Sequence, residues 1–478
     1  MRLSFINIGI FFPLFLLGEL YALKPITMEG KAPFAKEKEI WLYHYDDLLN
    51  KNKVFITKTT VDDSGNFFVQ VPIMETQELL ICFNTTEGSL FVEPEKNYSV
   101  TLHTNEQLIN HLEAKSLGNT IQIEIHQSDT NELNWKINYF NQFYNYFLFK
   151  HSLPILNMVK QSVYDSLLRI ITDKFPLSSD TNDFYSIYVK FRIAEIERMY
   201  YIKSPYKLYT KYLDNKYIHY HNPAYMDFFI TFFNDFLYTG SKKITKEILY
   251  QDINNLNNYF KLLDDLGKDP ILVNEIIREM ALIQNLGNLY AYFDEFNRSN
   301  ILSLLKRLSE TTKFPEHKIM AVNKIKSLTN LLLGSKAPEF TAFDIHNNTI
   351  SLSDYKGKYV FLHFFTKDCE DCIREMLIIK NLFEEFNEKV EFISVMLDFE
   401  PTLLYHFVNT YPDFKWKFVH FNNDFSFIEN YKLFALPLGM LIDNYGQIIS
   451  YPTPSSNELG NFFFSYFKSY TPQPSPPK

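Results

Sequence analysis

The feature that most constrains this fold is a near-continuous apolar run that ends just before two closely spaced cysteines. Residues 360–365 (VFLHFF) are followed by Cys369 and Cys372, which have only two residues between them. A continuous apolar run is typical of a strand that is buried on both faces of a sheet. A helix is predicted from the cysteines to about Asn387, so the CxxC pair opens a helix directly after a central strand.

Residues 334–470 predict an α/β unit around this strand. A second strand after the helix would complete a βαβ unit, and a turn at residues 443–446 indicates a hairpin. The further elements expected in this unit are a strand, a hairpin and a last helix: residues 390–397, 438–442 with 447–451, and 459–470. The Pro-rich tail at residues 471–478 is predicted to be disordered.

The spacing of the two cysteines indicates redox chemistry. Two residues between cysteines on one helical turn bring both sulfurs within disulfide reach. Free backbone N–H groups and the helix dipole favour a thiolate at the start of a helix. We therefore expect Cys369 to be the exposed nucleophile and Cys372, one turn deeper, to be the resolving thiol. A zinc site would need four ligands, and no second CxxC or nearby His supplies them. No metal and no cofactor are expected.

Four motifs of this unit resemble the TlpA/ResA family of exported thioredoxin-like thiol-disulfide oxidoreductases, which is related to the AhpC/TSA proteins. They are residues 334–340 (GSKAPEF), 350–358 (ISLSDYKGK), 369–375 (CEDCIRE) and the ALP and LID motifs of residues 435–446. The resemblance implies that Pro437 has a cis peptide bond against the CxxC and helps to receive substrate backbone. It implies that Glu375 tunes proton transfer. Protein disulfides as substrates and a membrane-bound thiol-disulfide electron donor are also implied.

The unit departs from the family pattern next to the cysteines. Asp368 stands where the family usually has Trp, Asp371 stands where it has Pro, and His363 occupies the position of a buried Asp in thioredoxin. Together with Glu370, the two aspartates oppose a thiolate on Cys369, which favours the disulfide and a reducing couple. His363 is either a core histidine with satisfied hydrogen bonds or a proton shuttle behind the resolving cysteine.

The rest of the chain predicts a multidomain α+β protein with an N-terminal β-sandwich at residues 24–103 and an α-helical region at residues 104–332. Some exported Bacteroidetes proteins join such parts to a TlpA-like domain, and the front of this chain resembles them. Cys82 lies within an apolar strand and is expected to be a small buried hydrophobe, with a redox partner for the CxxC as the alternative. His219 and His221 are expected in a surface loop rather than as a metal-binding pair. The elements expected here are strands at residues 40–45, 54–60, 67–71, 79–83 and 98–102, and helices at 133–150, 184–201, 225–238, 271–296 and 301–308.

Residues 1–22 predict a signal peptide, because a basic Arg2 precedes an apolar run at residues 5–17 and a small Ala22. The run is shorter than the ~20 residues of a membrane span. An uncleaved anchor is the alternative. The protein is therefore expected in the periplasm or cell envelope, where disulfides persist. The net charge of −9 argues against a nucleic-acid partner. The oligomeric state is left open.

Three functions fit the sequence. The first is a thiol-disulfide reductase that uses Cys369 and Cys372. The second is a peroxiredoxin-like peroxidase, because residues 366–369 satisfy the short T-x-x-C pattern, although His363 stands where peroxiredoxins place a proline. The third is a binding or scaffold protein with a degenerate redox site, in which residues 24–332 recognise a partner.

Overall fold

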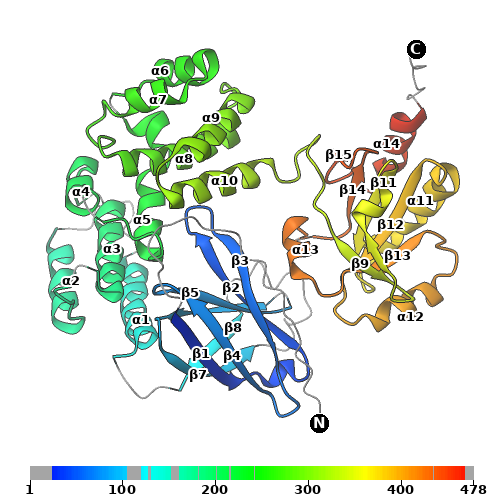
Figure 1. Ribbon diagram of the computed structural model, residues 1–478, viewed down its shortest axis with the longest axis horizontal. Coiled ribbons are helices and arrows are strands. Elements are labelled where there is room, and N and C mark those ends of the chain that lie inside the picture. Colours follow the sequence, from blue (N-terminus) through cyan, green and yellow to red (C-terminus); the bar gives the residue numbers. More distant parts are fainter. Residues whose placement is uncertain are drawn as a thin grey trace, which may run out of the picture.

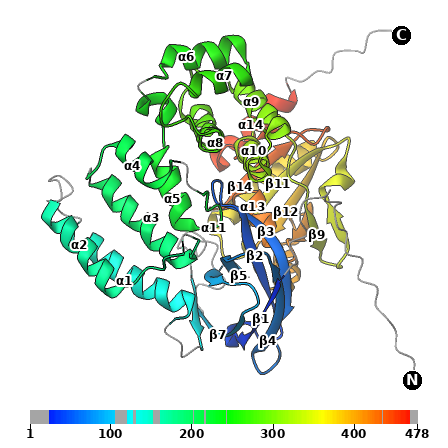
Figure 2. The same ribbon diagram turned by 60° about the vertical axis from the view of Figure 1, so that its left-hand side comes forward.

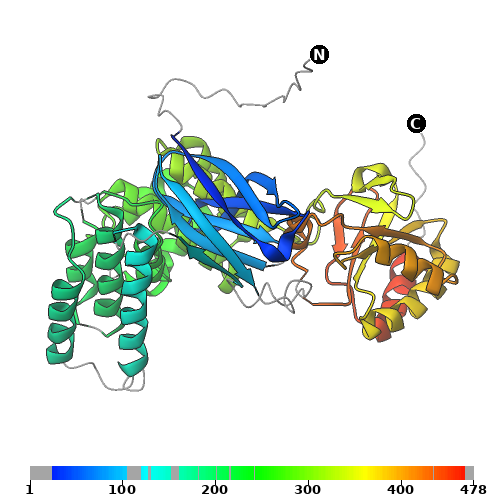
Figure 3. The same cartoon turned by 90° about the horizontal axis from the view of Figure 1, so that it is seen from below.

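A computed structural model describes ten stretches of the chain: residues 24–84, 86–104, 120–126, 131–151, 161–180, 182–200, 202–214, 217–241, 243–433 and 435–468. The expected signal peptide and C-terminal tail lie outside these residues. The strands of the N-terminal part stand between a helical part and an α/β part, as Figures 1 and 3 show. None of the helices within the described stretches combines the length and apolar character needed to cross a bilayer.

The N-terminal part is a sandwich of two four-stranded sheets. One sheet has the order β4-β1-β7-β8 and the other has the order β3-β2-β5-β6. In β4 every second residue is buried, as expected of a strand with one face toward a core. The strands are β1 (Lys24–Lys31), β2 (Glu39–Asp47), β3 (Asn52–Thr60), β4 (Asn66–Ile73), β5 (Gln77–Phe83), β6 (Thr86–Val92), β7 (Asn97–Thr104) and β8 (Ile121–Ile125).

Strand β8 lies within the region that was expected to be helical. It pairs antiparallel with β7, from Val100 opposite Ile125 to Thr104 opposite Ile121. The expected boundary at residue 103 therefore falls inside a hairpin of the sheet, and the sandwich continues to β8. The sequence of β8, IQIEI, alternates apolar and polar residues as a strand does, but it is only five residues long.

The helical part begins at α1 and ends at α10, which contacts β2. Figure 2 shows α10 passing close to the β2–β3 hairpin, where the Asn50 side chain donates to the Met320 carbonyl at 2.9 Å. Pro205, Pro223 and Pro315 each stand in the first turn of a helix, where a missing N–H costs nothing. The helices are α1 (Leu133–His151), α2 (Gln161–Lys174), α3 (Phe184–Met199), α4 (Pro205–Tyr212), α5 (Pro223–Phe232), α6 (Lys246–Tyr250), α7 (Tyr259–Leu266), α8 (Glu275–Tyr292), α9 (Arg298–Thr311) and α10 (Pro315–Thr329), with π-helical turns η4 (Phe236–Gly240) and η5 (Gln251–Leu256).

Two expected helices are shorter than the sequence indicated by four residues or more. The helix expected at residues 225–238 ends at Phe232, and Asp235 then takes a left-handed conformation with φ of 53° before η4. The helix expected at residues 271–296 begins at Glu275, because Asn274 caps it by accepting hydrogen bonds from the backbone of Ile276 and Ile277. Apolar periodicity alone does not locate such a cap.

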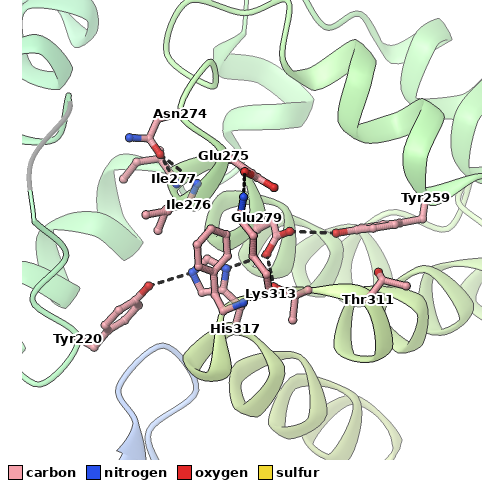
Figure 4. A network of polar contacts seen from close by, with 12 residues as sticks. Tyr220, Tyr259, Asn274, Glu275, Ile276, Ile277, Glu279, Thr311, Lys313 and His317 are labelled. Carbon is pink, nitrogen blue, oxygen red and sulfur yellow. Dashed lines mark hydrogen bonds and ion pairs between the residues drawn. The ribbon is translucent and has the colours of Figure 1, made fainter. Parts of the chain in front are cut away.

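A buried network of polar side chains connects the helices (Figure 4). Glu279 on α8 and His317 on α10 are both buried, and Oε2 of the glutamate lies 2.8 Å from Nδ1 of the histidine. Thr312 and Tyr259 donate to the carboxylate at 2.6 and 3.3 Å, and the other nitrogen of His317 lies 3.1 Å from the Tyr220 hydroxyl. Burial raises the pKa of the Glu279 carboxyl, but these hydrogen bonds outweigh it and leave the pKa lowered.

The C-terminal part is a seven-stranded sheet with the order β10-β9-β13-β12-β11-β14-β15. Central β11 pairs in parallel with β12 and antiparallel with β14. Helices α11, α12 and α14 contribute buried residues to the core on one face of this sheet, and α13 contributes to the core on the other. The elements are β9 (Thr341–Asp344), β10 (Thr349–Ser351), β11 (Tyr359–Phe365), α11 (Glu370–Phe386), β12 (Val390–Met396), α12 (Thr402–Thr410), β13 (Lys417–His420), α13 (Phe425–Asn430), β14 (Leu438–Ile442), β15 (Ile448–Ser450) and α14 (Ser456–Lys468).

Candidate active site

The two cysteines lie where the central strand ends and α11 begins. Cys369 is the N-cap of α11, and its Sγ accepts a hydrogen bond from the backbone N–H of Cys372 at 3.1 Å. The two sulfurs form a disulfide with an S–S distance of 2.01 Å. Cys369 is partly exposed, whereas Cys372 is fully buried. One sulfur is therefore open to an incoming group and the other is covered by the protein.

Pro437 lies at the same end of the sheet. Leu438, the first residue of β14, pairs with Phe364 near the end of β11, so the preceding proline stands beside the segment that leads to the cysteines. Leu436 packs against the core cluster that contains Cys372. The Leu436–Pro437 peptide is cis, as the resemblance implied. A second cis peptide, Tyr451–Pro452, has no counterpart among the expectations.

The residues described so far have the arrangement of a thiol-disulfide oxidoreductase, and comparison with known proteins agrees. Residues 333–450 match the AhpC/TSA family. ResA, a thiol-disulfide oxidoreductase of Bacillus thuringiensis subsp. konkukian, is 35% identical over 118 residues, which cover 24% of this chain and 67% of the relative. The Bacillus subtilis ResA is 31% identical over 127 residues, which cover 26% and 69%. The chain belongs to the family of the ResA thiol-disulfide oxidoreductases through its C-terminal part. This part is a ResA-like thiol-disulfide oxidoreductase domain.

Several solved structures similar to the ResA-like domain come from Bacteroides. The thioredoxin domain of a thiol-disulfide oxidoreductase from Bacteroides vulgatus is 25% identical, with a TM-score of 0.27, and the match covers 28% of this chain and 98% of that chain. A thiol:disulfide interchange protein from Bacteroides sp. is 24% identical, with a TM-score of 0.28, and the match covers 29% and 93%.

Two of the three acids around the CxxC of the ResA-like domain have a basic partner. Asp371 forms an ion pair with Arg374 on the same helix, and Lys367 Nζ lies 2.6 Å from the Asp368 carboxylate. The acidic surroundings expected for Cys369 from the sequence included the three acids but not these two bases. A signal was available, because Arg374 follows Asp371 by three positions and residues at this spacing face each other on a helix.

Asp398 is a further residue of the site that the sequence argument missed. It follows β12, and its carboxylate accepts a hydrogen bond from the Lys367 backbone N–H at 2.7 Å. Burial raises the pKa of this carboxyl overall, although the hydrogen bond from Lys367 and the charge of Lys367 act to lower it. Asp398 thus holds the loop that carries the first cysteine. Its position after the strand next to the central strand is the signal that could have identified it.

His363 and Glu375 lie behind the disulfide, between the sheet and α11. Both are almost fully buried, with 1% and 3% of their surface exposed. Nε2 of His363 lies 3.8 Å from Oε1 of Glu375, which is one turn after Cys372 on α11. Nδ1 of His363 lies 3.4 Å from Oγ of Ser394, whose oxygen also accepts a hydrogen bond from Trp416 at 2.7 Å. Burial lowers the pKa of His363 to about 3, so the ring is neutral.

The other residues singled out in the sequence lie away from this domain's cysteines. Burial lowers the pKa of His219 to about 4, and His221 lies 3.0 Å from Glu75, so each has its own surroundings in the loop before α5. No metal-binding group of His, Cys, Asp or Glu occurs among the described residues. Cys82 is partly exposed rather than buried, because it lies on the face of β5 opposite to the sandwich core.

Proposed function

We propose that the chain is an exported reductase of protein disulfides. The observation that carries the proposal is the pairing of a partly exposed Cys369 with a fully buried Cys372 at the start of a helix. In the reduced protein, the helix start favours a thiolate on Cys369, which attacks a substrate disulfide and forms a mixed disulfide. The thiolate of Cys372 then attacks Cys369 and releases the reduced substrate.

Two neighbours support these steps in the proposal. Pro437 stands beside the cysteines at the end of the sheet and receives substrate backbone next to Cys369. Glu375, buried on the same helix as Cys372, accepts the proton of the resolving thiol. The partial exposure of Pro437 and the burial of Glu375 suit these different roles.

The reducing direction follows from the charges near Cys369. Asp368, Glu370 and Asp371 oppose the thiolate, which favours the disulfide and makes the dithiol a better reductant. Lys367 and Arg374 weaken this effect, so we expect a potential that is less extreme than three uncompensated acids would give. The potential that tests this direction is measured by equilibration with glutathione, and a potential as positive as that of DsbA contradicts it.

Export, location and electron supply belong to the same proposal. Residues 1–22 direct the chain out of the cytoplasm, and the ResA-like domain works in the periplasm or cell envelope. A thiol-disulfide reductase in the membrane returns the cysteines to the dithiol form, because a catalytic reductase needs electrons at each turnover.

A trapping experiment tests the proposed mechanism. A Cys372→Ser variant lacks the resolving thiol, so we expect its Cys369 to hold substrates as mixed disulfides that dithiothreitol releases. The trapped proteins are identified by mass spectrometry after release. Cys369→Ser is the matched control and should trap nothing, and it should also lose insulin reduction by at least about a thousandfold.

Two outcomes would contradict the proposal. Insulin reduction that persists in Cys369→Ser would show that the cysteine pair is not the redox centre. Rapid peroxide consumption by the reduced wild-type protein, without disulfide reduction, would favour a peroxidase instead.

A further inference from the structure

We propose that His363 is a positioning residue for the redox reaction: its Nε2 atom accepts a hydrogen bond from the Glu375 carboxyl group while that group holds the proton released by Cys372. The inference rests on the proposed function, in which Glu375 is the proton acceptor. It adds a residue of β11 to the reaction and explains why a histidine stands in an otherwise apolar strand.

The side chain of His363 lies on the face of the sheet that α11 covers. Phe361 and Phe365, which lie two residues before and after His363 and point to the same face of the strand, belong to the core cluster that contains Cys372. The ring of His363 stacks on Phe365 with centroids 6.0 Å apart. Its Nε2 faces Glu375 across 3.8 Å, which is beyond hydrogen-bond reach in the disulfide form. A small movement of either side chain would close this distance.

With its hydrogen on Nδ1, the neutral ring of His363 leaves Nε2 as an acceptor. Ser394 Oγ accepts the indole N–H of Trp416 at 2.7 Å and lies 3.4 Å from Nδ1 of His363, where it can accept a second hydrogen bond. With its hydrogen on Nδ1 and directed at this oxygen, the neutral ring carries none on Nε2. Nε2 is buried and has no hydrogen-bond partner within the described part of the chain. A buried acceptor without a donor is unfavourable, so Nε2 gains most from a proton on Glu375.

The surroundings of His363 keep it neutral. The strand on one side contributes Ser394 and the strand on the other contributes Gly439, and neither is charged. Trp416 is also uncharged, and α11 contributes Glu375 and the cysteines. Burial is the cause that lowers the pKa of His363 to about 3. A neutral acceptor stabilises the carboxylic acid relative to the carboxylate, so it makes Glu375 a stronger base.

The proton and electron balance is as follows. The Cys369 thiolate attacks a disulfide, and the first half of the substrate leaves as a thiolate. The Cys372 thiol passes its proton to the Glu375 carboxylate, and the new carboxyl O–H is held by Nε2 of His363. The Cys372 thiolate then bonds to Cys369, and the second half leaves as a thiolate. Two electrons move from the cysteines to the substrate, whose two thiolates take up one proton from water and the one returned by Glu375.

A substitution of His363 should slow the resolving step and leave the first attack unchanged. His363→Phe keeps a ring of similar size and removes the acceptor. Reduced protein is mixed with oxidised glutathione, quenched in acid, alkylated and analysed by mass. We expect resolution to slow about tenfold near neutral pH, the effect of one hydrogen bond to a buried group. Glutathione therefore accumulates on Cys369. The difference should close at high pH, where hydroxide removes the Cys372 proton.

Three companion variants separate this role from a loss of packing. Glu375→Gln should reproduce the accumulation, and adding His363→Phe to it should change nothing further. Phe361→Leu, on the same face of the strand, should lower stability without accumulation of the mixed disulfide. Ser394→Ala keeps the imidazole but removes the partner of Nδ1, so it should slow resolution in the same direction, even if His363→Phe does not fold.

The outcomes distinguish this inference from the proposed function. A folded His363→Phe that resolves at the wild-type rate at every pH overturns the inference and leaves the reductase intact. A further loss when His363→Phe is added to Glu375→Gln also overturns it. The proposed function itself is overturned if the wild-type protein does not react with oxidised glutathione, or if the Cys369→Ser variant reacts with it as fast as the wild type does.

Discussion

Single residues in the helical part set a pH dependence of stability. The carboxyl groups of Asp252 in η5 and Asp265 in α7 are buried and hydrogen-bonded to each other. Burial, the hydrogen bond and the charge of Asp265 raise the pKa of Asp252 to about 6. Lys261 and Lys268 contact Asp265 and help to keep it ionised. One proton is therefore shared by the two carboxyl groups at low pH.

We expect Asp252→Asn to stabilise the protein above pH 7. The folded-state pKa of Asp252 lies above its unfolded value, so its contribution is present at low pH and is lost as the pH rises through about 6. An asparagine amide donates to Asp265 at every pH. The variant should gain about 1–3 kcal/mol at pH 8 and much less at pH 4. Urea unfolding followed by circular dichroism at both pH values measures this difference.

Asp264→Asn is the matched control, because Asp264 is exposed and directly precedes Asp265 on α7. It should change the stability little at either pH. An Asp252→Asn gain that is equal at both pH values, or a loss at pH 8, would contradict the shared proton.

At the scale of elements, the start of α11 combines opposing electrostatic effects. The helix start favours a thiolate on Cys369, and the three acids oppose it. Arg374 is placed to offset Asp371, and Lys367 to offset Asp368. Each charge is exposed and screened, so each effect is modest.

Removal of Arg374 should make the Cys369 thiolate less stable. In a Cys372→Ser background, Arg374→Gln leaves Asp371 uncompensated, and we expect the pKa of the Cys369 thiol to rise by up to about half a unit. The rate of iodoacetamide alkylation against pH measures this pKa. Lys380→Gln removes a cation further along the same helix and should leave the alkylation profile unchanged. A lower pKa in Arg374→Gln would refute the compensation.

The elements that the sequence predicted well have either a nearly continuous apolar run or a clear helical period. The run at residues 360–365 and the strand at 390–397 correspond to β11 and β12, and the helix at 133–150 corresponds to α1. The position of the CxxC in the fold could be predicted, because the strand before it and the helix after it are both clear in the sequence. The pairing of His363 with Glu375 could not, because it joins a strand to a helix and depends on side-chain packing between them.

Strands β1, β6 and β8 were not predicted. Pro25 in β1 lies opposite Pro72 in β4, and proline is unusual within a sheet. β6 contains Gly88, which also weakens a strand pattern. A Cβ atom there would come within 2.3 Å of the Ile121 carbonyl oxygen, so the close approach of β8 requires glycine. The strand signal was therefore lost at the residue that lets the two strands meet.

At the scale of the whole molecule, the ResA-like domain touches the sandwich through charged groups. Lys53 of β3 forms an ion pair with Glu87 and lies 3.8 Å from Glu429 of α13. Lys38 lies 3.4 Å from Glu400, which is near the loop held by Asp398. Burial alone would lower the pKa of Lys53, but the two glutamates raise it overall. The division of the chain into domains at residues 24–103, 104–332 and 334–470 stays a prediction.

We expect Glu429→Lys to separate the ResA-like domain from the sandwich. The substitution places two like charges across a partly buried contact, which costs several kcal/mol. The domains should keep their folds while the radius of gyration from small-angle X-ray scattering increases. Glu384→Lys makes the same charge change on the exposed face of α11 and should leave the radius unchanged. An unchanged radius in Glu429→Lys would mean that this contact does not hold the two parts together.

The position of Cys82 bears on how the chain can be oxidised. Three cysteines admit three pairings, but Cys82 lies in β5, which is hydrogen-bonded to β2 on one side and to β6 on the other. Both ladders hold the backbone around Cys82 in place, so this thiol stays on the outer face of the sandwich while Cys369 and Cys372 open and close their disulfide at α11. The chain therefore confines its covalent rearrangement to two sulfurs three residues apart, and the fold of the sandwich does not depend on the oxidation state of α11.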